Sequence, residues 1–174
     1  MMLLLTHVFQ ACKSVKSGSI NSSGKKYYTS FYVGESCTQY FIKPISYTNA
    51  KTKGELFLDF TFRYRNSDIT KDTVNISLSI IEDSFYKSID SIQISTKDNN
   101  ESFNTDTFMF VEAKKRAYLS RFTFKSNLSK IKNLFDNNSW SIKVFYNSEI
   151  LDYNCKKKTN KIINILKSKV FVFF

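Results

Sequence analysis

The sequence predicts a mostly β protein: an antiparallel β-sandwich of immunoglobulin-like geometry, with two short helices near the C-terminus. The first observation is that residues 55–81 alternate apolar and polar side chains in two runs separated by a polar turn. The apolar rows are Leu56, Leu58, Phe60, Phe62 and Tyr64, then Val74, Ile76, Leu78 and Ile80. Successive strand side chains point to opposite faces, so each run buries one row.

The second observation is composition. Strand-forming aromatics are abundant, with 17 Phe and 10 Tyr, whereas 4 Gly and 1 Pro leave most turns to Asn, Asp and Ser. Short alternating runs at regular spacing are typical of a sandwich. The alternative is a single curved antiparallel sheet with both helices on one face.

Two strands are expected before the central hairpin. Residues 26–33 would form the first, and residues 37–42 the second, ended by Pro44 because proline cannot donate to a strand ladder. The parity of the first strand places four side chains on one face: Tyr27, Thr29, Phe31 and Val33. A polar loop over 47–54 then leads to the hairpin.

The remaining strands are expected at 89–95, 107–111, 117–125, 140–146 and 150–153, with a turn over 97–102 and a tight connection at Asn147 and Ser148. A helix starting at Ser126 or Asn127 would carry apolar residues at helical spacing: Leu128, Ile131, Leu134 and Phe135. A second helix would start at Thr159 or Asn160. The terminal run 170–174 (VFVFF) is expected to be a buried strand, because an exposed one invites aggregation.

A single domain is expected, because 174 residues can bury a core without metals or many disulfides. Residues 1–12 form an apolar segment that ends in a cysteine. Residues 13–26 are rich in Ser, Gly and Lys and predict a flexible tether. Residues 27–174 form the β-rich domain.

The N-terminal segment MMLLLTHVFQAC places an apolar run and a small residue, Ala11, directly before Cys12. It resembles the lipobox of small bacterial lipoproteins, in which signal cleavage precedes a cysteine that is then acylated. The resemblance implies cleavage after Ala11, a lipid on Cys12, and export to the bacterial envelope, on the periplasmic side or at the outer membrane. It departs from the pattern in its missing basic region, its short apolar run, and Phe9 and Gln10.

Two cysteines remain if Cys12 carries a lipid. In an exported, oxidising setting a disulfide between Cys37 and Cys155 is the default expectation. The alternative is two unpaired thiols in a cytosolic chain, each buried as a small apolar residue.

The formal net charge is +11, and the basic residues are nearly all Lys, with Arg at 63, 65, 116 and 121. The densest cluster is Lys156, Lys157, Lys158 and Lys161. We place the triplet 156–158 in the loop before the last helix, because lysines at a helix N-terminus oppose its dipole. This cluster either contacts an anionic headgroup or polysaccharide, or simply solubilises the loop. The excess of Lys, Asn and Ile is also what codon bias in an AT-rich genome produces.

The sole histidine is His7, in the segment expected to be removed. The domain therefore lacks an imidazole for a catalytic triad or a zinc site, and we predict no catalytic residues, no metal and no cofactor. Acidic pairs such as Glu82 with Asp83 fall in predicted turns, where acidic residues are ordinary.

These features together predict an exported, lipid-anchored, non-enzymatic domain that acts as a binding or structural module, with another envelope protein or an anionic polysaccharide as its partner. The alternative is a cytosolic basic domain that binds single-stranded nucleic acid. Its stacking platform would consist of Tyr27, Tyr28, Phe31 and Tyr32, beside Lys25 and Lys26.

Overall fold

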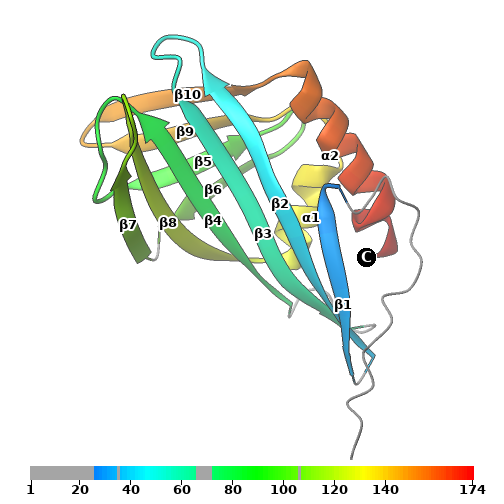
Figure 1. Ribbon diagram of the computed structural model, residues 1–174. Coiled ribbons are helices and arrows are strands. Elements are labelled where there is room, and N and C mark those ends of the chain that lie inside the picture. The colour runs from blue at the N-terminus through cyan, green and yellow to red at the C-terminus, as the bar shows by residue number, and fades with distance from the viewer. Residues whose placement is uncertain (1–25, 35, 66–71, 106) are drawn as a thin grey trace, which may run out of the picture.

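A computed structural model of the protein describes residues 26–34, 36–65, 72–105 and 107–174. These residues form one ten-stranded antiparallel sheet, curled into a half-barrel, and two helices (Figure 1). The strands are β1 (Tyr28–Gly34), β2 (Cys37–Asn49), β3 (Glu55–Arg65), β4 (Thr73–Glu82), β5 (Ser91–Ser95), β6 (Asn100–Asn104), β7 (Thr107–Ala113), β8 (Tyr118–Asn127), β9 (Ser141–Tyr146) and β10 (Glu149–Cys155). The helices are α1 (Leu128–Phe135) and α2 (Lys157–Lys169), followed by a 3-10 turn, η2 (Phe171–Phe173).

The strand order is β6-β5-β9-β10-β2-β3-β4-β8-β7, with β1 paired to β2. The mostly β prediction is therefore confirmed, in the form of the single curved sheet rather than the sandwich. The inner face of the sheet is covered by α1, α2 and η2, so no second sheet is needed to bury it. At the far side the curl brings β6 toward β8, where the Phe103 and Phe124 rings lie 5.3 Å apart.

The central hairpin forms as predicted. β3 and β4 pair from Glu55 with Ile81 to Phe62 with Val74, and the predicted inward rows have exposed fractions of 0–1%, except Tyr64 at the open end. The predicted first helix is also confirmed: its four apolar residues are buried against the sheet. Local alternation and helical spacing were sufficient here because both elements pack one face on the same core.

β1 buries Tyr28, whereas Phe31 and Val33 face solvent. Three local predictions before the helices are wrong. β2 does not end at Pro44 but continues to Asn49, because a register shift between Ile42 and Ile45 accommodates the proline. Residues 47–49, which we expected in a polar loop, therefore belong to this strand. Residues 100–102 begin β6 instead of completing a turn.

The C-terminal predictions need similar correction. α2 begins at Lys157, so two lysines of the cluster lie in its first turn and Thr159 is inside the helix. Within the terminal run 170–174, residues Phe171–Phe173 form a 3-10 turn rather than a strand. Val170 and Phe171 are buried, but Val172 and Phe173 are 62% and 65% exposed.

Candidate functional site

Four connections meet at one end of the sheet: β2–β3, β4–β5, β7–β8 and β10–α2. The β2–β3 turn lies beside the end of β4, because Glu55 pairs with Ile81. The β7–β8 turn lies beside the same end of β4, because Glu82 pairs with Tyr118. α2 starts next to β2, where the Thr159 hydroxyl donates to the Ser46 carbonyl at 2.7 Å. Since neighbouring strands are about 4.8 Å apart, the four connections share one surface.

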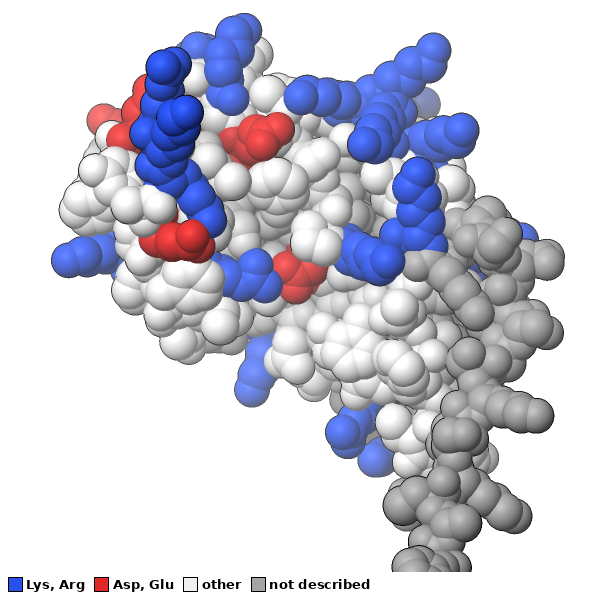
Figure 2. Space-filling view, in the orientation of Figure 1, with Lys and Arg blue, Asp and Glu red and all other residues white. Residues whose placement is uncertain are grey.

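These connections carry a concentration of exposed cations that we name the basic rim. Its members are Lys51, Lys53, Lys87, Lys114, Lys115, Arg116, Lys156, Lys157 and Lys158. These four connections and the strand ends beside them hold three exposed acidic residues, Asp83, Asp90 and Glu112, and Glu112 pairs with Lys114. Figure 2 shows Lys and Arg side chains gathered around the upper end of the molecule. The basic rim is therefore strongly cationic.

The β2–β3 turn is held rigidly by Asn49. Its Oδ1 accepts hydrogen bonds from the backbone N–H groups of Lys51 (2.9 Å) and Thr52 (3.3 Å). Lys53 adopts a positive φ of 63°, which the turn requires. This Asx-type turn fixes the backbone from which two rim lysines project.

A buried carboxylate lies directly beneath the basic rim. Glu82 is 5% exposed and accepts hydrogen bonds from the hydroxyls of Tyr153 and Thr52, both at 2.8 Å. Gly54 leaves room for it, since a Cβ at that position would collide with the carboxyl group. Burial, and then the bond to Glu82, raise the pKa of Tyr153, so its hydroxyl stays protonated and donates. The cluster ties β10, β4 and the β2–β3 turn together.

The neighbouring Tyr86 extends this cluster. Its backbone N–H donates to the buried Ser120 hydroxyl at 2.8 Å, and its ring meets Tyr146 edge-on at 5.0 Å. Burial, and then the charges of Glu82 and Glu149, raise the pKa of Tyr86. The segment after β4 is thereby fixed against β8 and β9.

An exposed aromatic pair adjoins the cations of the β7–β8 turn. Phe85 and Tyr118 are 48% and 37% exposed, and their ring centroids lie 5.5 Å apart. The Lys87 ammonium lies 5.7 Å from the Phe85 centroid. The basic rim therefore offers flat apolar surface as well as positive charge.

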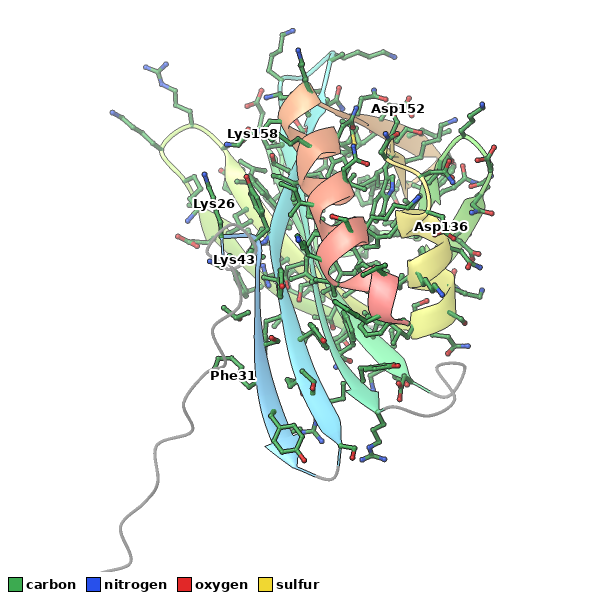
Figure 3. All side chains as sticks on the ribbon, turned by 90° about the vertical axis from the view of Figure 1, so that its right-hand side faces the viewer. Lys26, Phe31, Lys43, Asp136, Asp152 and Lys158 are labelled. Carbon is green, nitrogen blue, oxygen red and sulfur yellow. The ribbon has the colours of Figure 1, made fainter. Side chains whose placement is uncertain are left out.

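The predicted lysine cluster contributes to this surface. Lys156, Lys157 and Lys158 enter the basic rim, and Lys161 is exposed one turn further along α2. Figure 3 shows Lys158 at the upper end of that helix. Sequence reasoning missed the partners that the topology brings to them, namely Lys51, Lys53, Lys87 and the 114–116 run.

Sequence reasoning also missed Glu82, which we assigned to a solvated turn. A signal was present: the inward parity of Val74, Ile76, Leu78 and Ile80 continues to residue 82. Extending the alternation by one step places the carboxylate in the core, where it requires hydrogen-bond donors.

The predicted disulfide is wrong. Cys37 pairs with Arg65 at one end of β2, whereas Cys155 pairs with Tyr47 near the other end, so the two cysteines lie roughly 30 Å apart at about 3.3 Å per residue. A disulfide requires Cα atoms within about 7 Å. Both thiols are free, Cys37 buried and Cys155 partly buried. Burial raises the pKa of Cys155 to about 11, against a smaller lowering by the Trp140 N–H that donates to its Sγ.

Two further predictions concern the lipid-attachment site and the aromatic stacking platform. Cys12 and Lys25 lie outside the described residues, so the lipid-attachment site stays a prediction. The proposed stacking platform does not form one surface, because Tyr28 is buried and Tyr27 partly buried, whereas Phe31 and Tyr32 are exposed.

The described residues contain no group of three or more His, Cys, Asp or Glu side chains placed to hold a metal ion. Within the same residues, neither helix is long and apolar enough to cross a bilayer. We compared the chain with protein-family models, curated proteins and solved structures, and none matches it.

Proposed function

We propose that this protein is an exported, lipid-anchored, non-enzymatic module of a bacterial envelope that binds an anionic polysaccharide through the basic rim. The anchor is inferred from the sequence around Cys12. The binding role is carried by one observation: four connections distant in sequence place their cations at the same end of the sheet.

The placement of the α2 lysines supports a bound anion. Lys157 and Lys158 occupy the first turn of α2, and Lys156 is its N-cap without a side-chain capping bond. Cations at this end of a helix oppose the macrodipole, at a cost of about 0.3–1 kcal/mol each. An anion bound across the three ammonium groups would offset that cost.

The shape of the molecule also favours binding at the surface. The inner face of the sheet is filled by aromatic residues, Phe60 and Phe62 against Phe135 and Phe171, with ring centroids 5.8 Å apart in each case. The basic rim lies outside this core, so a long polymer can reach it without any rearrangement.

Heparin affinity provides the test of the polysaccharide site. The triple variant Lys51→Ser, Lys115→Ser, Arg116→Ser should elute at lower salt and bind at least about tenfold more weakly, since each cation near a charged surface contributes about 1 kcal/mol. The matched control, Lys97→Ser, Lys125→Ser, Lys143→Ser, removes the same charge from exposed positions elsewhere. Equal weakening of both variants would show that net charge, and not the basic rim, determines binding.

The anchor has a separate test. Cells expressing the full chain are labelled with a palmitate analogue, which should be incorporated in the wild type and absent from Cys12→Ser. A wild type that carries no label would end the lipid-anchor proposal.

A second candidate, a cytosolic single-stranded nucleic-acid binder, is favoured by the exposed Phe85–Tyr118 pair beside the 114–116 cations. Bases stack on such rings for about 1–3 kcal/mol each. A labelled oligonucleotide should then bind at low salt, with binding weakened by Phe85→Ser and by added salt. No change in anisotropy at low salt would exclude it.

A further inference from the structure

The end of the sheet opposite the basic rim carries several exposed apolar residues. At the β1–β2 hairpin, Phe31, Tyr32, Val33 and Phe41 have exposed fractions of 54%, 63%, 51% and 41%. We call these four residues the hairpin tip. Phe31 and Phe41 meet edge-on at 6.0 Å, and Figure 3 shows Phe31 on the outer side of β1, away from the helices. A clustered apolar surface of this kind marks an interaction site rather than scattered exposure.

A pocket with two arginines adjoins the hairpin tip. Gln39 of β2 lies between Phe31 of β1 and Arg63 of β3 in the strand register. Arg63 and Arg65 both line an open pocket of about 380 Å³, whose other walls are Gln39, Thr61, Phe62, Asp72, Thr73 and Asn75. The apolar tip and the cationic pocket are thus neighbours on the outer face of the sheet.

The pocket holds one arginine in a fixed orientation. The Arg63 Nε donates to Gln39 Oε1 at 2.8 Å, and Gln39 Nε2 donates in turn to the Phe62 carbonyl at 3.0 Å. A guanidinium held through Nε presents its two terminal nitrogens as a fork, the geometry that binds phosphate oxygens in pairs. Two guanidinium groups outweigh the single Asp72 carboxylate in the lining.

We propose that this end of the protein docks on an anionic lipid bilayer, with the hairpin tip at the level of the lipid headgroups and Arg63 and Arg65 on a lipid phosphate. Aromatic residues concentrate at this depth of a membrane, where one part of the ring is in contact with hydrocarbon and the other with water. Neither a purely apolar nor a purely charged partner would satisfy both the tip and the pocket. Arg63 and Arg65 in the pocket favour an anionic bilayer over a neutral one.

The orientation of this docking rests on the proposed lipid anchor. From Cys12 to Tyr28 the chain can extend at most about 55 Å, at roughly 3.5 Å per residue, so an anchored domain stays within reach of the bilayer. With the hairpin tip on the membrane, the basic rim at the other end of the sheet faces away from it. The same molecule would then hold an anionic polymer on its distal side.

The experiment uses the full chain with Cys12→Ser, so that no lipid contributes to binding. Flotation with vesicles of phosphatidylcholine plus phosphatidylglycerol should carry the protein, and phosphatidylcholine alone should carry much less. Phe31→Ser with Val33→Ser, and separately Arg63→Gln with Arg65→Gln, should each weaken binding about tenfold or more. Phe85→Ser, an exposed aromatic of the other end, should bind like the parent. Failure of the parent to float, or binding as tight as the parent's by either double variant, would overturn the proposal.

Fluorescence reports which end enters the membrane. Tyr32→Trp should shift its emission to the blue on adding vesicles and be quenched by brominated acyl chains, whereas Tyr118→Trp should not change. The native Trp140 is 1% exposed and provides a constant background. A response from Tyr118→Trp alone would contradict the proposed orientation. Palmitate labelling tests the anchor independently of these measurements. The Cys12→Ser protein would bind vesicles through the hairpin tip even if the wild type carried no lipid.

Discussion

The two ends of the sheet are stabilised by different chemistry. Beneath the basic rim, a buried carboxylate collects two hydroxyl donors and ties three segments together. Behind the hairpin tip, stabilisation comes from aromatic packing: Phe171 stacks on Phe135 at 4.0 Å, and Phe174 lies 4.3 Å from Tyr64. One end therefore depends on hydrogen bonds to a charge, the other on apolar burial. The exposed residues at each end thus rest on a rigid support of their own.

The largest expected effect is at the aromatic end. Phe171→Ala removes a ring that is 3% exposed and contacts Phe62, Phe135 and Phe174, so the free energy of unfolding should fall by about 3–5 kcal/mol. Urea denaturation measures this loss in the free energy of unfolding. Phe173→Ala, two residues on and 65% exposed, is the matched control and should change stability by less than about 0.5 kcal/mol. Similar losses in both variants would mean that the C-terminus is not docked as described.

A smaller effect is expected beneath the basic rim. Tyr153→Phe leaves the buried Glu82 carboxylate with one donor fewer, which should cost about 1–3 kcal/mol in urea denaturation. Adding Glu82→Gln to this variant should cost less than Glu82→Gln does alone, because the two groups interact directly. Strictly additive losses would show that the hydrogen bond contributes nothing.

The third prediction concerns pH. Because burial raises the pKa of Cys155 from 9.0 to about 11, the folded state retains the thiol proton more tightly than the unfolded state does. The contribution of the protonated Cys155 thiol to the free energy of unfolding is complete below pH 9. This contribution is lost as the pH rises to about 11. Wild type should therefore lose more stability than Cys155→Ala between these pH values, as measured by the urea midpoint. Parallel losses would contradict the raised pKa.

The smallest effects are expected for the exposed residues themselves. Phe31→Ser at the hairpin tip and Lys115→Ser in the basic rim should each change the free energy of unfolding by less than about 0.5 kcal/mol. Each should nevertheless weaken binding at its own end, to vesicles or to heparin. A destabilisation above about 1 kcal/mol would assign that residue to folding instead of binding.

Much of the fold could be predicted from local pattern. The alternation in β3 and β4 and the spacing of Leu128, Ile131, Leu134 and Phe135 predicted both the elements and their buried faces. Parity alone did not say which face of β1 is buried, because Phe31 lies at a hairpin end beyond the core. The prediction that the second strand ends at Pro44 was wrong, because a register shift lets the strand ladder resume at Ile45.

The candidate site was predicted only in part. The lysine run at 156–158 is visible in the sequence, but its neighbours across the sheet are not. Lys51 and Arg116 come together because β2–β3, β4 and β8 pair in that order, and pairing between distant strands leaves no mark in the local sequence. The separation of Cys37 from Cys155 likewise follows from the strand register alone.

By itself, the sequence determined that this chain builds antiparallel strands with one apolar face, since side-chain alternation is a property of each strand separately. That these strands form one curled sheet closed by the C-terminal helices became clear only from the three-dimensional arrangement. The same arrangement also decided that cations gather at one end and exposed aromatics at the other. The physical reason is that curl, strand order and register are set by packing between segments far apart in the chain.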